Sequence, residues 1–154
     1  MNDENKIIIY QVFTRLFGNN NNHCVYNGDI VTNGCGKMAD FTLKALSEIK
    51  KLGTTHIWYT GIIEHATQTD YRRYNISPDH PAIVKGKAGS PYAIKDYYDV
   101  DPDLANDIPE RMREFENLVR RTHRAGLKVI IDFVPNHVAR QYLSLIHISE
   151  PTRL

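Results

Sequence analysis

The sequence predicts an α/β fold in which parallel strands alternate with helices. Three short apolar runs, at residues 7–13, 55–63 and 127–134, have the composition of buried strands. Between consecutive runs lies a segment whose apolar residues recur at helical spacing, at residues 41–52 and 107–126. The order strand, helix, strand, helix, strand is that of a right-handed parallel unit. Such units build doubly wound sheets or closed (β/α)8 barrels, and both bind ligands where the strands end.

The first strand and the first helix have clear sequence boundaries. Residues 7–13 are rich in β-branched and aromatic side chains, which predicts a strand buried on both faces. In residues 41–52, lysines and Glu48 lie opposite the apolar positions, and Gly53 follows as a C-terminal cap. The second strand, at residues 55–63, begins almost at once, so the connection between helix and strand is short.

The second helix is predicted to begin with a capping box. We expect Asp107 as its N-cap, with Glu110 three residues further on, and Gly126 as the cap of its other end. The third strand, at residues 127–134, follows directly. It is closed by Pro135, which cannot donate a hydrogen bond to a sheet.

Composition and charge limit the classes of function. Of the 154 residues, 42% are hydrophobic, which is enough for the core of one domain. The net charge of +1 comes from 19 basic and 18 acidic residues spread along the chain, which argues against nucleic acid and membranes as partners. Cys24 and Cys35 lack metal-binding spacing and are expected to be free thiols. Since neither a signal-peptide pattern nor an apolar run of ~20 residues is found, we expect a soluble, cytoplasmic protein.

The loops that follow the first two strands are unusually long. They comprise roughly 25 and roughly 40 residues, against two to six in ordinary α/β turns, and loops of this length are often functional. Flat aromatic faces in a cleft suit sugar rings, although most loop tyrosines only pack the loop onto its own domain. The tyrosines of the second loop are Tyr71, Tyr74, Tyr92, Tyr97 and Tyr98.

The stretch DFVPNH, residues 132–137, places Asp, Asn and His at the exit of a hydrophobic strand. It resembles the first conserved region of the α-amylase family, glycoside hydrolase family 13, at the end of the third barrel strand. Three further segments resemble that family in the same order: IIIYQVFTRLF, NGCGKMADFTLKALSEIKKLGTTHIWYT and SPYAIKDYYDVDPDLA. The resemblance spans residues 6–142 and implies a partial TIM (β/α)8 barrel, with its first three strands and two helices only.

The resemblance implies roles for four residues. His137 would contact the sugar at the reacting subsite, and Tyr92 would form the stacking platform beneath it. Asp132 would support the active site by holding an arginine of the following strand, and Asn136 would be a calcium ligand in members that bind calcium. Without the resemblance, such residues are more often turn, cap or packing residues.

The resemblance also implies an enzymatic activity, but it assigns no catalytic carboxyl group to a residue of this chain. Retaining glycosidases need two carboxyl groups about 5 Å apart, and the family takes them from the fourth and fifth barrel strands. The implied whole protein hydrolyses α-glucosidic bonds of an α-glucan or malto-oligosaccharide with retention, while the present chain is expected to be inactive. The alternatives are a transglycosidase or another α-glucan-processing member, a non-catalytic barrel homologue, or a small α/β binding module complete in itself.

The end of the chain has a separate interpretation. The stretch LSLIHISEPTR, residues 143–153, matches codon for codon a transposase adapter used in sequencing libraries, so we expect residues 143–154 to be a non-biological tail. Residues 1–142 are then the N-terminal part of the catalytic domain. Because three of eight strands cannot close a barrel, this piece alone is expected to aggregate or to remain loose.

Overall fold

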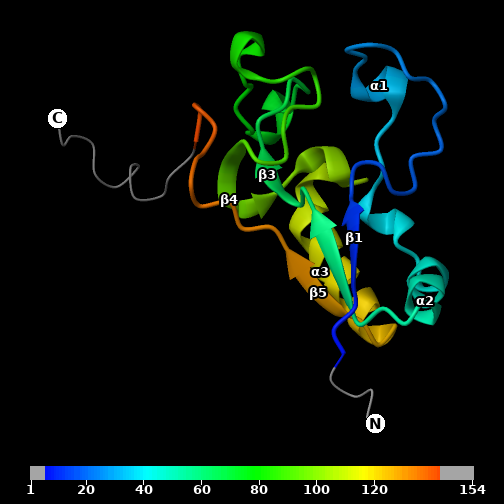
Figure 1. Ribbon diagram of the computed structural model, residues 1–154. Coiled ribbons are helices and arrows are strands. Elements are labelled where there is room, and N and C mark those ends of the chain that lie inside the picture. The colour runs from blue at the N-terminus through cyan, green and yellow to red at the C-terminus, as the bar shows by residue number, and fades with distance from the viewer. Residues whose placement is uncertain (1–5, 143–154) are drawn as a thin grey trace.

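The computed structural model describes residues 6–142 and contains a three-stranded parallel sheet. Its strands are β1 (Ile9–Phe13), β2 (His56–Thr60) and β5 (Lys128–Ile131), in the order β1-β2-β5 (Figure 1). All three run in the same direction, with Tyr10 opposite Ile57 and Ile57 opposite Val129. The predicted alternation of parallel strands and helices is therefore confirmed, and the fold belongs to the α/β class.

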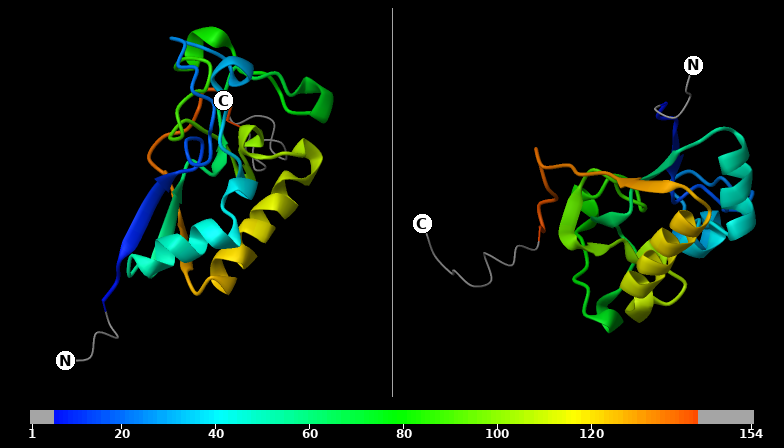
Figure 2. Two further views of the ribbon diagram at one scale, coloured as in Figure 1. Left: turned by 90° about the vertical axis from the view of Figure 1, so that its right-hand side faces the viewer. Right: turned by 90° about the horizontal axis from the view of Figure 1, so that it is seen from below.

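Two helices, α2 (Leu43–Lys51) and α3 (Arg111–Arg124), cover one face of this sheet (Figure 2). Thr42 caps α2, because its hydroxyl accepts a hydrogen bond from the backbone N–H of Ala45 at 3.2 Å. Between helices and sheet lies one apolar core. Its fully buried members include Phe41, Leu46, Ile57, Tyr59 and Leu118.

The beginning of α3 differs from the predicted capping box. The helix starts at Arg111, after a 3-10 turn at Ile108–Glu110, and neither Asp107 nor Glu110 makes a side-chain capping hydrogen bond. Instead, the carboxylate of Glu114 in the first helical turn accepts hydrogen bonds from the backbone N–H groups of Asn106 at 3.0 Å and Asp107 at 2.8 Å. The predicted capping carboxylate, Glu110, is therefore wrong. The carboxylate that bonds the backbone before the helix is Glu114, which lies within the helix.

The second predicted strand is two strands. The chain turns at Gly61, whose φ of +79° favours glycine, and β3 (Ile63–His65) pairs antiparallel with β4 (Ile94–Val100). The loop after β1 also contains a short helix, α1 (Ile30–Asn33). The prediction of three strands and two helices only is therefore too simple. The remaining 3-10 turns are Met38–Asp40, Arg72–Tyr74, Pro81–Ile83 and Pro102–Leu104.

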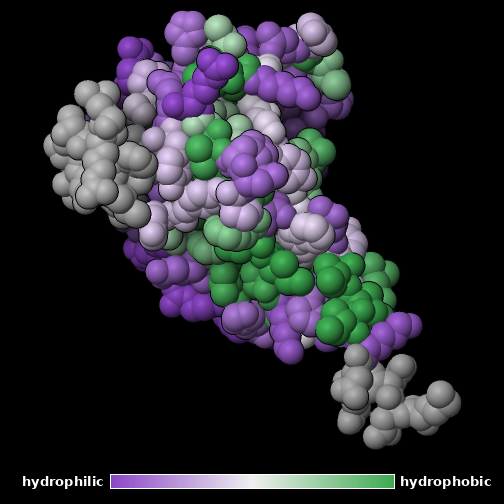
Figure 3. All heavy atoms as spheres, turned by 60° about the vertical axis from the view of Figure 1, so that its left-hand side comes forward, coloured by the Kyte–Doolittle hydropathy of each residue, from purple (hydrophilic) through white to green (hydrophobic). Residues whose placement is uncertain are grey.

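The sheet face opposite the helices exposes apolar side chains, so the prediction that residues 7–13 are buried on both faces is wrong. Ile7 is 67% exposed, Ile9 48% and Ile131 40%. Figure 3 shows hydrophobic side chains gathered on one face of the molecule. The reason is that α2 and α3 lie on a single side of the sheet. Within residues 6–142, no helix has the length and apolar character needed to cross a membrane; the expected tail, residues 143–154, lies outside the described residues.

Candidate functional site

Asp132 lies directly after β5 and joins the exits of two neighbouring strands. Its Oδ1 accepts a hydrogen bond from the indole Nε1 of Trp58 at 2.5 Å, and its Oδ2 accepts one from the backbone N–H of Gly61 at 3.2 Å. These partners come from β2 and the turn after it. The arginine implied by the resemblance is not among the partners that the described residues give Asp132.

Sequence reasoning missed Trp58 as a positioning residue. The available signal was the indole N–H, which needs a hydrogen-bond partner when a tryptophan is half-buried in a strand. A carboxylate at the end of an adjacent parallel strand can supply that partner. The Trp58–Asp132 hydrogen bond therefore holds the start of the loop that carries His137 against the end of β2.

His137 is exposed on this loop after β5. Its Nδ1 lies 2.9 Å from Oδ1 of the neighbouring Asn136. A neutral imidazole that donates from Nδ1 has Nε2 as an acceptor, and the other tautomer reverses the two roles. An exposed imidazole of this kind can hydrogen-bond a hydroxyl group of a ligand.

Tyr92 lies just before β4, in the loop that follows β2 and β3. Its side chain is 46% exposed, and its backbone N–H donates to the hydroxyl of Ser90 at 3.4 Å. A half-exposed tyrosine ring presents a flat apolar face with a polar edge. This is the surface that stacking on a sugar ring requires.

The loop that carries His137 is bonded to β4, the strand that begins two residues after Tyr92. The backbone N–H of Ala139 donates to the carbonyl oxygen of Ile94 at 2.8 Å. The hydroxyl of Tyr97 on β4 donates a hydrogen bond to the carbonyl oxygen of Val134. The ring centroids of Tyr97 and Phe133 are 5.6 Å apart. Tyr97 therefore serves packing, as expected of most loop tyrosines, and it fixes the β5 loop on β4.

The described residues do not assemble a calcium site around Asn136. This side chain is exposed, and its one carbonyl oxygen contacts His137. Within residues 6–142, no three His, Cys, Asp or Glu side chains gather in a way that could hold a metal ion. Calcium takes six to eight oxygen ligands, so one neutral oxygen does not constitute a site.

A group of buried charges lies beneath the β3–β4 hairpin, and sequence reasoning did not find it. Nζ of Lys95 lies 3.0 Å from Oδ2 of Asp79 and 3.9 Å from Oε1 of Glu64, and all three side chains are almost fully buried. Burial raises the pKa of Glu64 to about 7, although Lys95 acts in the opposite direction. These partners come from separate segments of the long loop, so no local pattern indicated them.

The acidic segment after β4 is a second source of buried ion pairs. Asp101 pairs with His65, with 3.0 Å between Oδ2 and Nδ1. Asp103 pairs with Arg15 and accepts a hydrogen bond from the hydroxyl of Tyr71 at 2.6 Å. These pairs fasten the loop after β1 and the β3–β4 hairpin to the segment before α3, and thereby position the loop that bears Tyr92.

The family is shown by comparison with known proteins. The model of the α-amylase catalytic domain matches residues 11–149, so the chain belongs to this family. This confirms the resemblance carried by the DFVPNH stretch and the three further segments.

Individual relatives have different activities. The chain is 28% identical over 134 residues to the amino acid transporter heavy chain SLC3A1 of Mus musculus, with 87% of this chain and 14% of the relative covered. It is 26% identical over 137 residues to the trehalose-6-phosphate hydrolase of Bacillus subtilis, with 89% and 18% covered. The crystal structure of an α-amylase from Lactobacillus plantarum superposes with a TM-score of 0.61 at 28% identity, covering 94% of this chain and 26% of that one. The chain thus spans less than a fifth of the length of these two curated relatives.

Proposed function

We propose that the chain is the N-terminal part of a (β/α)8 catalytic domain in an enzyme that acts on an α-glucan or malto-oligosaccharide. The supporting observation is the hydrogen bond between Ala139 and Ile94, which ties the loop of His137 to the start of β4, two residues after Tyr92. Both side chains are exposed, and both loops follow carboxyl ends of paired parallel strands, where α/β proteins bind ligands.

In this proposal each residue has a distinct task. The ring of Tyr92 stacks on the apolar face of a glucose unit, and the imidazole of His137 hydrogen-bonds one of its hydroxyl groups. Asp132 acts through position, because its bonds to Trp58 and Gly61 fix the start of the His137 loop. None of the described carboxylates is assigned as nucleophile or general acid, so the chain itself binds saccharide without cleaving it.

The reaction of the whole protein has more than one candidate. Hydrolysis of α-glucosidic bonds is favoured by the hydrolase names among the relatives, such as the Bacillus subtilis trehalose-6-phosphate hydrolase. Transfer of the glucosyl group to another sugar uses the same substrate contacts. A non-catalytic role is a separate candidate, because the mouse relative is named a transporter heavy chain and matches this chain equally well.

Calorimetric titration of the monomeric, folded fraction of the 154-residue chain with maltoheptaose tests the proposal, because the chain alone is expected to aggregate in part. Binding is expected, with no release of reducing sugar, and Tyr92→Ala should weaken it about tenfold, the equivalent of one lost stacking contact. Tyr98→Ala is the matched control, because Tyr98 is 72% exposed on the neighbouring strand β4. Equal affinities of the two variants, or the absence of any binding, would contradict the proposal.

A further inference from the structure

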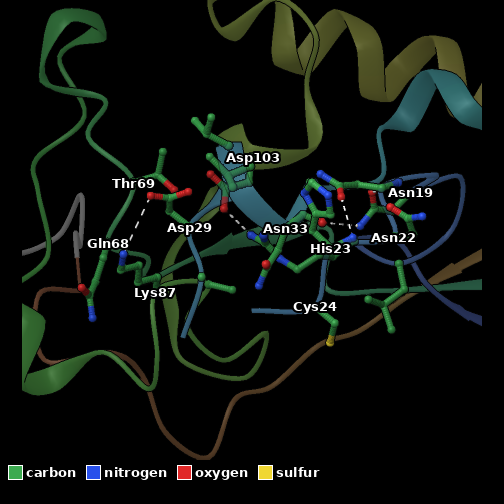
Figure 4. A pocket seen from close by; sticks show the side chains of 18 of the residues that line it. Asn19, Asn22, His23, Cys24, Asp29, Asn33, Gln68, Thr69, Lys87 and Asp103 are labelled. Atoms are coloured by element: carbon green, nitrogen blue, oxygen red, sulfur yellow. Dashed lines mark hydrogen bonds and ion pairs between the residues drawn. The ribbon is translucent and has the colours of Figure 1, made fainter. Parts of the chain in front are cut away.

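A pocket separate from Tyr92 and His137 lies between the loop after β1 and the loop after β3. Its volume is about 540 Å³, within the range of small-molecule sites. One wall comes from residues 15–34 and the other from residues 68–70 and 87–88, with Asp103 between them (Figure 4). Since β1 and β2 are paired in the sheet, both walls follow neighbouring strands.

The asparagine-rich stretch after β1 builds one wall through its own hydrogen bonds. Asn19 Nδ2 donates to the carbonyl oxygen of Asn33 at 3.0 Å, and Asn21 Nδ2 donates to that of Thr32 at 2.9 Å. The amide of Asn33 bonds the backbone N–H and carbonyl of Val25 at 3.0 and 2.9 Å. These bonds hold the wall in shape before a ligand arrives, which lowers the entropic cost of binding.

The lining combines apolar surface with neutral polar groups. Leu16 and Val31 are 63% and 87% exposed, and they provide apolar contact area. In Figure 4, Asn22 and His23 lie on the side of the asparagine-rich loop, and Gln68 on the opposite side. Apolar patches beside amide and imidazole groups suit a ligand that has both C–H faces and hydroxyl groups.

The charges around the pocket are paired with one another. Three lining carboxylates each have a cationic partner, so little net charge is left for an ionic ligand. The pairs are Arg15–Asp103, Lys87–Asp29 and Arg72–Asp70. We infer that the pocket is a second saccharide site that takes a neutral oligosaccharide, an inference that rests on the proposed action on α-glucans.

Cys24 offers a direct readout of this pocket, because its exposed thiol belongs to the lining. Burial raises the pKa of the half-buried Cys35 to about 11. Iodoacetamide at about pH 8 should therefore alkylate Cys24 first. Maltotriose should slow this reaction roughly tenfold when ~90% of the pockets are filled. Intact-mass analysis restricts the measurement to folded molecules, in which Cys35 is still unmodified.

Variants distinguish this pocket from the Tyr92 region. Val31→Trp should fill the pocket and abolish protection by maltotriose, whereas Leu52→Trp is the control, since Leu52 is exposed at the end of α2 and is not among the lining residues. Tyr92→Ala should weaken maltoheptaose binding at the proposed active site and leave protection of Cys24 unchanged. If the pocket binds no saccharide, protection of Cys24 is absent. If the proposed function is wrong, the effect of Tyr92→Ala on maltoheptaose binding is absent, so the two results can be told apart.

Several outcomes would overturn the inference. An unchanged alkylation rate in the presence of maltotriose would show that the pocket binds no saccharide. Protection by inorganic phosphate at lower concentration than maltotriose would assign the pocket to anions. Equal loss of protection in the Val31→Trp and Leu52→Trp variants would place the effect outside the pocket. Alkylation of Cys35 as fast as Cys24 would show that the loops do not form a pocket.

Discussion

Trp58 and Asp132, which are 74 residues apart in the sequence, form a hydrogen bond of 2.5 Å between the exits of β2 and β5. The second oxygen of the same carboxylate accepts the backbone N–H of Gly61. One carboxylate thus determines how two parallel strands end relative to each other. The loops that carry Tyr92 and His137 both begin at this junction.

Replacing Trp58 with Phe should destabilise the fold and weaken maltoheptaose binding together. The variant leaves Oδ1 of Asp132 without its donor, at a cost of about 1–3 kcal/mol in the free energy of unfolding. Asp132→Ala should cost at least as much, because it removes the acceptor of both hydrogen bonds, the one from Trp58 and the one from Gly61. Urea unfolding followed by circular dichroism measures both, at one chain concentration because association shifts the midpoint.

The double variant is the decisive control for this pair. If the two side chains act through their mutual hydrogen bond, the Trp58→Phe and Asp132→Ala effects should not add. Tyr98→Phe, at an exposed position of β4, should leave the unfolding midpoint unchanged. Additive losses would show that Trp58 contributes only through packing.

Arg15→Met should destabilise the chain far more than Arg72→Met. Both arginines pair with an aspartate, but the side chains of Arg15 and Asp103 are 12% and 0% exposed, against 70% and 53% for Arg72 and Asp70. Removing Arg15 leaves a buried carboxylate without its cation, which costs about 3–5 kcal/mol, whereas an exposed pair contributes at most about 1 kcal/mol. The two urea midpoints give the comparison, and similar values would argue against a buried ion pair at Asp103.

Glu64 should make the stability depend on pH. Because burial raises its pKa from 4.5 to about 7, the folded state keeps a proton that the unfolded state has lost between these two values. The free energy of unfolding should therefore fall as the pH rises through this window, by on the order of 2–3 kcal/mol, and should be flat above it. Lys95, Asp79 and Asp101 are charged groups near Glu64. They are unchanged in the variants that test this pH dependence.

The Glu64→Gln variant should remove that slope. It should be more stable than the parent chain at about pH 8 and similar to it at about pH 4, where the parent side chain is protonated in both states. Glu48→Gln is the control, since the Glu48 side chain is 60% exposed and pairs with Lys51 on α2. If the free energy of unfolding depended on pH in the same way for the parent chain and for Glu64→Gln, burial would not disfavour the ionised form of Glu64.

The order of the parallel strands and of the helices between them could be predicted from the sequence, because hydrophobic period is a local property. Leu46 and Gly53 lie within one short segment that the sequence predicts as a helix at residues 41–52, and the observed α2 spans Leu43–Lys51 within it. Tyr92, His137, Asn136 and Asp132 were found through a resemblance to a family and not through spacing. Their roles toward sugar remain predictions, and the structure adds the bonds that hold Asp132.

The polar interactions between loops could not be predicted. Arg15 and Asp103 are 88 residues apart, and many carboxylates of the chain could have been the partner of either Arg15 or Lys95. Which carboxylate is chosen depends on how the β3–β4 hairpin folds onto the sheet, a property of tertiary structure. The split of the second apolar run at Gly61 has the same origin, because β3 exists only through its pairing with β4.

Gly89→Ala should damage the loop that leads to Tyr92, and Gly53→Ala provides the matched comparison. Both glycines have positive φ, +74° and +82°, so an added Cβ strains each backbone by about 1–2 kcal/mol. At Gly53 the nearest atom to that Cβ is Cδ1 of Ile8 at 3.6 Å, an ordinary contact, whereas at Gly89 it would lie 1.8 Å from the carbonyl oxygen of Ala66. A backbone oxygen cannot turn away as a side chain can, and the N–H of Ala66 is itself bonded to the carbonyl of Ala93 at 3.0 Å. Gly89→Ala should therefore lose at least about 3 kcal/mol of unfolding free energy, and maltoheptaose affinity with it, while Gly53→Ala keeps its affinity. Equal losses of stability in urea titrations of the two variants would mean that Gly89 does not approach Ala66.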